Sequence, residues 1–320
     1  MNPSELTAFG STGLSVSRLC LGTSSWGPIR AGETAEQRES RIATLADAFF
    51  DGSLGLNFID TSNIYGDSLS EGFIGAAIVR AGGIGTGLVL ETKLDRDGET
   101  GDFSADQMWR SLEQSLARLG TDHLQVLYLH DPEHIGFERS MDDGGVVAAL
   151  VSMKEQGIVS SIGISGGPVQ MLQQFIETDL FDALVTHNRF TLVDRSADAL
   201  FDACTRRDVG VTNAAPFGAG VLTGAPRFAN TYGYREIRPA TRAAVEAMTA
   251  ACSSHGVSLA AAALQFSMRE PRIHSTIVGA SDLGRMRESL AWANEEIPEE
   301  LWAELEVLVP DASEWLDVTD

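Results

Sequence analysis

The chain has 320 residues, of which 43% are hydrophobic, and its 45 acidic residues against 23 Lys+Arg give a formal net charge of −22. Such a charge repels phosphate backbones and anionic lipid, so neither nucleic acid nor a membrane surface is an expected partner. No apolar run approaches the roughly 20 residues that span a bilayer, no secretory signal is recognisable, and the scattered Cys20, Cys204 and Cys252 indicate a reducing, cytoplasmic location.

Strand-like and helix-like segments alternate along the chain. Short apolar runs rich in β-branched residues predict strands at 16–24, 57–62, 87–94, 123–131, 159–166, 183–188, 210–216 and 275–281. Helical periodicity predicts helices at 37–50, 69–80, 105–119, 145–156, 168–177, 197–207, 241–254, 258–269 and 283–292. Apolar strands separated by helices indicate a parallel sheet buried on both faces. Eight such units predict an α/β fold, a (β/α)₈ TIM barrel, as a single domain over 1–320.

The two ends of the chain add to the predicted barrel. The segment 6–17 reads as a β-hairpin with a turn near Gly10–Gly13, placed to cap the barrel floor. The segment 298–309 predicts an extra C-terminal helix that begins with proline. An open doubly wound sheet is the alternative, but the glycine-rich run at 82–87 precedes a strand instead of opening a helix, so it does not match a dinucleotide-binding loop.

Polar residues mark the ends of six successive predicted strands, after mainly apolar interiors. They are Thr23, Asp60, Lys93, His130, Ser165 and Asn188. Because the carboxyl ends of barrel strands meet at one face, where barrel enzymes carry their chemistry, these side chains are predicted to line a common cavity. Tyr65, one of only four tyrosines, follows shortly after Asp60. Lys93 is one of only two lysines among the 23 basic residues.

Asp60, Tyr65, Lys93 and His130 at these positions resemble the catalytic tetrad of the aldo-keto reductase family. The resemblance extends from about residue 9 to residue 290, and its most specific stretch is NFIDTSNIYGDSLSEGFIGAAI at 57–78. The segments VLYLHDPE and NAAPFGAGVLTG are most similar to the branch of sugar 1-dehydrogenases and pyridoxal dehydrogenases. The resemblance implies an NAD(P)-dependent oxidoreductase, aldose 1-dehydrogenase-like, that interconverts an alcohol or sugar hemiacetal with a carbonyl or lactone. The alternative is a catalytically idle nicotinamide-binding barrel that acts as a redox sensor or regulatory subunit.

Elementary chemistry is consistent with these four roles. Hydride transfer to a carbonyl requires a proton donor, and the reverse oxidation requires a base. A phenol with a pKa near 10 suits neither at neutral pH, so Lys93 is expected to lower the pKa of Tyr65. Asp60 is expected to keep Lys93 charged, and His130 to hydrogen-bond the substrate oxygen. The individual alternatives are a capping aspartate, a surface tyrosine, a snorkelling lysine and a core histidine.

The resemblance also implies cofactor contacts by position. They are Gly22, Thr23, Asp60, Ser165, Asn188, Phe217, Gly218, Gly220, Gly279, Ser281, Arg285 and Ser289. Gly166 replaces a usual asparagine, and Asn188 stands where glutamine is common. A lysine that grips the 2′-phosphate of NADP in the family falls at Gly279 here, while its partner arginine is Arg285. Use of both NAD and NADP is therefore expected, with NAD at least competitive.

The remaining predictions concern the substrate, metals and assembly. Tyr65 and His130 are expected to contact a small carbonyl, aldose or alcohol, and Trp26 either forms a wall of that pocket or simply packs. The run HDPEH at 130–134 resembles a metal-ligand cluster, but its proline and strand-to-loop position argue against an i, i+4 helical pair, so no metal is expected. A monomer or small homo-oligomer is expected.

Overall fold

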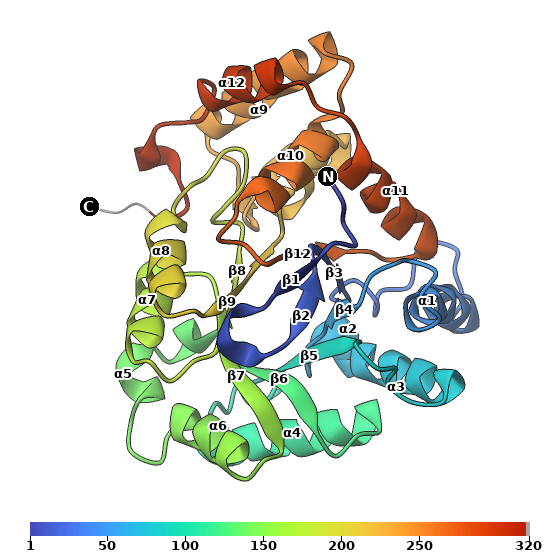
Figure 1. The fold of residues 1–320 in the computed structure, drawn as a ribbon, viewed down its shortest axis with the longest axis vertical. Helices are drawn as coiled ribbons and strands as arrows, with labels where there is room; N and C mark the ends of the chain where they lie inside the picture. The colour runs from blue at the N-terminus through green and yellow to red at the C-terminus, as the bar shows by residue number, and fades with distance from the viewer. Residues whose placement is uncertain (318–320) are drawn as a thin grey trace.

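Eight parallel strands close into a barrel in the computed structural model, which describes residues 1–317 (Figure 1). The barrel strands are β3 (Leu19–Gly22), β4 (Phe58–Asp60), β5 (Val89–Leu94), β6 (Leu124–His130), β7 (Val159–Gly166), β8 (Ala183–His187), β9 (Gly210–Ala214) and β12 (Ser275–Gly279). The last strand pairs with both β9 and β3, so the barrel has no open edge. The predicted (β/α)₈ barrel is confirmed.

Helices surround the barrel, as Figure 1 shows. The longer ones are α1 (Ala35–Phe50), α3 (Ser70–Ala81), α4 (Ala105–Leu119), α6 (Val146–Glu155), α7 (Val169–Glu177), α8 (Asp198–Arg206), α9 (Pro239–Ser254), α10 (Leu259–Arg269), α11 (Leu283–Asn294) and α12 (Glu299–Glu306). Side chains that cap the first turn set several of the starts. Thr34, for example, forms a reciprocal capping box with Gln37, so α1 begins two residues before the predicted 37.

A hairpin crosses one mouth of the barrel (Figure 1). Strands β1 (Leu6–Ala8) and β2 (Ser15–Ser17) pair antiparallel, and Phe9 between them reaches into the barrel interior, where its ring lies 5.6 Å from that of Phe58. The predicted hairpin is confirmed. The predicted strand 16–24 is divided, because its first residues pair with β1 and only Leu19–Gly22 joins the barrel.

The barrel interior is a packed core that contains one unusual polar pair. Most of the inward side chains are apolar, among them Val126, Val185 and Ile277. Glu91 and Tyr128 also lie there, fully buried, and the Tyr128 hydroxyl donates to a carboxyl oxygen of Glu91 at 2.8 Å. The neighbouring strand accommodates the Tyr128 ring at Gly163, where a Cβ atom would lie only 2.3 Å from the ring.

A long segment between β9 and α9 covers the mouth opposite the hairpin. It contains the 3₁₀ turns η3 (Gly218–Thr223) and η4 (Pro226–Phe228) and the two short strands β10 (Thr231–Tyr232) and β11 (Arg235–Glu236). The sequence prediction treated this segment as a loop, because strands of two residues leave no periodicity to detect. Within residues 1–317 no single helix has the length and apolar character to cross a membrane, and only α9 and α10 taken together, as a pair bent by 100°, pass that test by length and composition.

Candidate active site

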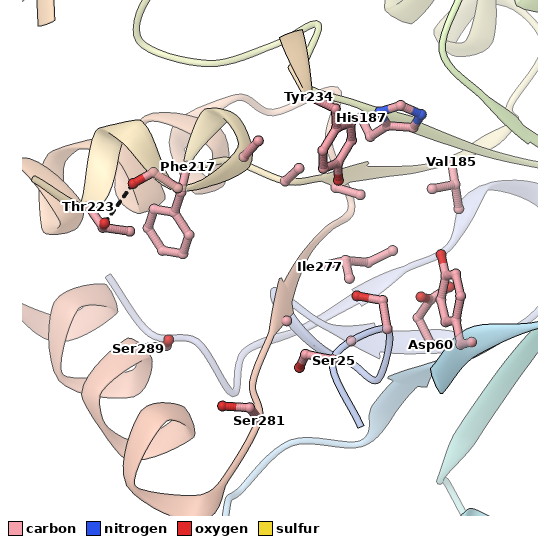
Figure 2. A pocket seen from close by; sticks show the side chains of 18 of the residues that line it. Ser25, Asp60, Val185, His187, Phe217, Thr223, Tyr234, Ile277, Ser281 and Ser289 are labelled. Carbon is pink, nitrogen blue, oxygen red and sulfur yellow. Dashed lines mark hydrogen bonds between the residues drawn. The ribbon is translucent and has the colours of Figure 1, made fainter. Parts of the chain in front are cut away.

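A cavity of about 990 Å³ opens at the carboxyl ends of the barrel strands. It is elongated, and Figure 2 shows Phe217, Ser281 and Ser289 toward one end and Asp60 toward the other. Many of the predicted site residues line it: Gly22, Asp60, Tyr65, His130, Ser165, Phe217, Gly220, Gly279, Ser281, Arg285 and Ser289. The barrel therefore brings strand ends and loops that are distant in the sequence to one surface.

Five predicted site residues do not line the cavity: Thr23, Trp26, Lys93, Asn188 and Gly218. For Trp26 the sequence left two alternatives open, a wall of the cavity or simple packing. Its side chain is fully buried, and its indole Nε1 donates to the Ala280 carbonyl at 3.0 Å. In this structure Trp26 packs in the core between the first and last barrel loops and forms no wall of the cavity. Of the two alternatives, the structure therefore agrees with simple packing.

Lys93 and Asp60 form a buried ion pair beneath the cavity. Their side chains are 1% and 3% exposed. The Lys93 ammonium donates to Asp60 Oδ1 and, at 2.7 Å, to the Thr61 carbonyl. Burial is the largest single effect and lowers the pKa of Lys93, but Asp60, Tyr65 and Glu91 together outweigh it and raise that pKa. The lysine is therefore held as a cation at the floor of the site.

Tyr65 lies directly above this ion pair. It begins the short helix α2 (Tyr65–Ser68), and its ring centroid is 4.6 Å from Lys93 Nζ and 5.7 Å from the His130 ring, which it meets edge to face. Burial raises the pKa of the Tyr65 phenol, and the charge of Lys93 offsets only part of that rise. Lys93 lowers the pKa of Tyr65, as expected, but burial has the larger effect, so the net pKa lies above its usual value.

The loop that carries Tyr65 is held against the first barrel loop. Gly66, Asp67 and Ser68 all have positive φ, which costs non-glycine residues energy. A Cβ atom on Gly66 would lie 2.6 Å from the backbone nitrogen of Gly27, so only glycine permits this approach. The close packing of the two loops fixes the position of the phenol.

His130 has a partner that the sequence prediction did not include. Its Nδ1 lies 2.6 Å from Oδ1 of Asp95, just beyond β5, and 3.3 Å from the Ser62 hydroxyl. Burial is the largest single effect and lowers the pKa of His130, but the charge and hydrogen bond of Asp95, together with the charge of Asp131, give a net rise. A usable sequence signal existed: Asp95 is two residues after Lys93, and side chains two apart on a strand share a face.

Three further side chains gather beside His130. Asp131, Glu133 and His187 each bring a potential ligand atom to within 4.8 Å of the others. Glu133 Oε2 is buried and accepts no hydrogen bond within the described residues, and burial lowers the pKa of His187 to about 4. The sequence prediction compared His130 with His134 and omitted His187, because β8 is distant in sequence from this loop. His134 is exposed.

The nicotinamide end of the expected cofactor is predicted to lie at the ends of β7 and β8. Ser165 faces the cavity. Asn188 is fully buried behind His187, and its Oδ1 accepts no hydrogen bond among residues 1–317. A carboxamide presents both donors and acceptors, and the Ser165 hydroxyl can act as either. Asn188 does not reach the cavity in this structure, so its contact with the cofactor stays a prediction.

The adenosine end fits the first turn of α11. Ser281, Arg285, Glu288 and Ser289 line the cavity there. Asp282 caps the helix by accepting from the backbone nitrogen of Arg285 at 2.9 Å, and the Arg285 guanidinium is already paired with Glu288 at 2.7 Å. Asp282 is paired with Arg30, which also donates to the Ser281 hydroxyl at 2.7 Å. The Glu288 carboxylate, which lines the cavity and engages Arg285, makes this end a poorer site for a 2′-phosphate than one lined by cations alone.

Comparisons with known proteins agree with this geometry. A family model described as "Aldo/keto reductase family" matches residues 18–309 of this chain. L-galactose dehydrogenase of Arabidopsis thaliana is 31% identical over 92% of this chain and 90% of its own length. D-threo-aldose 1-dehydrogenase of a Pseudomonas species is 30% identical over 64% of this chain and 62% of its own length. The holo form of an aldo-keto reductase from Bacillus halodurans superposes with a TM-score of 0.76 at 20% identity, over 95% of this chain and 96% of the other.

Proposed function

The chain belongs to the aldo/keto reductase family and is an NAD(P)-dependent oxidoreductase; we propose that it oxidises a sugar hemiacetal at C1 to the lactone, as an aldose 1-dehydrogenase. The observation that carries the proposal is the assembly of Tyr65, His130 and the Lys93–Asp60 pair at a cavity of about 990 Å³ that the β9 loop and the start of α11 also line. The bound nicotinamide supplies the hydride acceptor, or the hydride in the reverse direction.

Tyr65 is the proton-transfer group in this proposal. Its hydroxyl holds a proton at neutral pH, because burial raises the pKa of the phenol, and this suits donation to an oxygen that gains charge during carbonyl reduction. In the oxidative direction the deprotonated Tyr65 oxygen, the phenolate, receives the proton of the substrate hydroxyl, so the phenol must first give up its own proton. The Lys93 ammonium stabilises negative charge on the phenol oxygen at both stages, and Asp60 fixes the position of that ammonium.

The substrate class is inferred from the wall next to His130. Asp131, Glu133 and His187 present carboxylate oxygens and a neutral imidazole to the same cavity. Carboxylates accept hydrogen bonds strongly from hydroxyl groups, so a polyhydroxylated substrate satisfies this wall better than an apolar aldehyde does. The names of two relatives, L-galactose dehydrogenase and D-threo-aldose 1-dehydrogenase, support an aldose.

The test is a panel of aldoses, pyridoxal and simple aldehydes, assayed with NAD and NADP by the absorbance of the reduced nicotinamide. Tyr65→Phe should lower kcat by about 10²- to 10⁴-fold and leave cofactor affinity nearly unchanged. Tyr234→Phe is the matched control, since Tyr234 lines the same cavity but is 72% exposed. Cofactor binding without turnover of any substrate would favour the idle regulatory barrel, and a Tyr65→Phe enzyme above about a tenth of wild-type kcat would contradict the role of Tyr65.

A further inference from the structure

We infer that Asp95 is a positioning residue for His130: it accepts the Nδ1 hydrogen of the imidazole and so presents Nε2 to the substrate oxygen. The inference rests on the proposed function, because it assigns His130 to the substrate oxygen. Nδ1 lies 2.6 Å from Asp95 Oδ1. His130 lines the cavity, while Asp95 is buried and does not. The two ring nitrogens therefore have different surroundings, and Nε2 is the one left on the cavity side.

The Asp95 carboxylate is itself held in one orientation. Its Oδ2 accepts from the Ser62 hydroxyl and, at 3.3 Å, from the backbone nitrogen of Ile64. Its own backbone nitrogen donates to the Ser111 hydroxyl at 3.0 Å. Oδ2 is thus committed to donors on the β4–α2 loop, and only Oδ1 is available to His130. A side chain fixed in this way imposes one ring orientation and one tautomer.

The tautomer decides what His130 does for a hydroxyl substrate. With Nδ1 protonated, a neutral ring carries its lone pair on Nε2 and accepts the hydrogen of a substrate hydroxyl; a protonated ring donates from Nε2 to a carbonyl oxygen. The opposite tautomer keeps a hydrogen on Nε2 and cannot accept. Asp95 therefore makes the histidine suitable for both sides of an alcohol–carbonyl interconversion.

Other charged or titratable groups also act on the His130 ring, from every element packed against it. They are Lys93 on β5, Tyr65 on α2, Asp131 and Glu133 beyond β6, and His187 on β8. Asp131 is the only other carboxylate within 4 Å of the ring in the described part of the chain, at 3.6 Å from Nε2. It lies on the cavity side, so it does not replace Asp95 at Nδ1.

Replacing Asp95 by asparagine tests the inference with little change of shape. The Ile64 nitrogen requires an acceptor at the Oδ2 position, so the amide nitrogen of the substituted side chain turns toward His130 and forces the opposite tautomer. Asp95→Asn should lower kcat/KM by about 10- to 100-fold. It should also shift the part of the kcat/KM pH profile that depends on His130 toward lower pH by about one pH unit or more, because the negative charge of Asp95 is lost. Asp97→Asn, a partly exposed neighbour on the same loop, should change neither.

A double variant separates an effect through His130 from a general one. In a His130→Gln background, adding Asp95→Asn should change kcat/KM by less than about threefold. Equal losses in both backgrounds would overturn the inference. The inference would also be overturned if the kcat/KM pH profile of Asp95→Asn alone showed no shift.

A measurement on the wild-type holoenzyme keeps the test independent of whether variants fold. Nitrogen-15 NMR of the histidine rings should show Nδ1 of His130 protonated throughout the pH range in which the protein is folded. Deprotonated Nδ1 in the neutral ring would overturn the inference. The proposed function fails separately, if Tyr65→Phe keeps its activity or no substrate turns over.

Discussion

The buried pair Asp60–Lys93 gives the sharpest stability prediction. Asp60→Asn preserves the size of the side chain but removes the only carboxylate that the Lys93 ammonium contacts within 4 Å in the described residues. Removing one partner of a buried ion pair leaves an uncompensated charge and costs about 3–5 kcal/mol. Both side chains are at most 3% exposed, so water does not replace the lost carboxylate.

The size of the chain converts this cost into a melting shift. At about 2.1 cal/mol/K per residue, a chain of 320 residues has an unfolding entropy of about 0.7 kcal/mol/K. The expected fall in Tm is therefore about 4–7 °C. Differential scanning calorimetry measures it directly, with the apo protein at one pH and salt concentration.

A surface pair of the same kind provides the control. Asp47 pairs with Arg80 at 2.6 Å, and the two side chains are 46% and 45% exposed. Asp47→Asn should shift Tm by less than about 1.5 °C, since exposed pairs contribute about 0–1 kcal/mol. Equal Tm values for Asp60→Asn and Asp47→Asn would refute the reasoning, because burial would then have no influence on the cost.

Three further substitutions test the same geometry. Lys93→Arg should abolish most turnover while the protein stays folded, because a guanidinium does not fit the compact site of the ammonium; full activity here, with loss in Lys154→Arg, would show that the wrong lysine was assigned. Arg285→Ala should lower the affinity for NADP more than the affinity for NAD in binding titrations, by about one to two orders of magnitude. Glu288→Gln should raise the affinity for NADP. A wild-type preference for NADP above about a thousandfold would contradict both predictions. Burial raises the pKa of Glu91 well above its usual value, so above pH ~4.3 the unfolded chain releases a proton that the folded protein keeps. The free energy of unfolding therefore falls as pH rises, by up to about 1.4 kcal/mol per pH unit. Glu91→Gln should remove that slope in denaturant titrations at about one-unit steps between pH 5 and 7, and an unchanged slope would show that Glu91 is ionised in the folded protein.

Much of the fold was predictable because it rests on local patterns. Apolar strands alternating with amphipathic helices left few alternatives to a closed parallel barrel, and the ends of those strands then placed Asp60, Lys93 and His130 at one face. Tyr65 could be added because it follows Asp60 within a few residues. These predictions needed only periodicity and the rule that carboxyl ends of parallel strands meet.

Tertiary structure alone decided the contacts between distant segments and the degree of burial. The spacing of Asp95 from Lys93 places its side chain on the Lys93 face of the chain, but its contact with His130 joins the ends of two different strands, β5 and β6, and His187 comes from a third, β8. Those contacts depend on how the strands are arranged in the barrel. Trp26 follows a strand as a pocket residue would, yet the closure of the barrel buries it under Ala280. The same closure determines how far Tyr65 is removed from water, and its pKa rises because that loss of solvation exceeds the effect of one neighbouring ammonium.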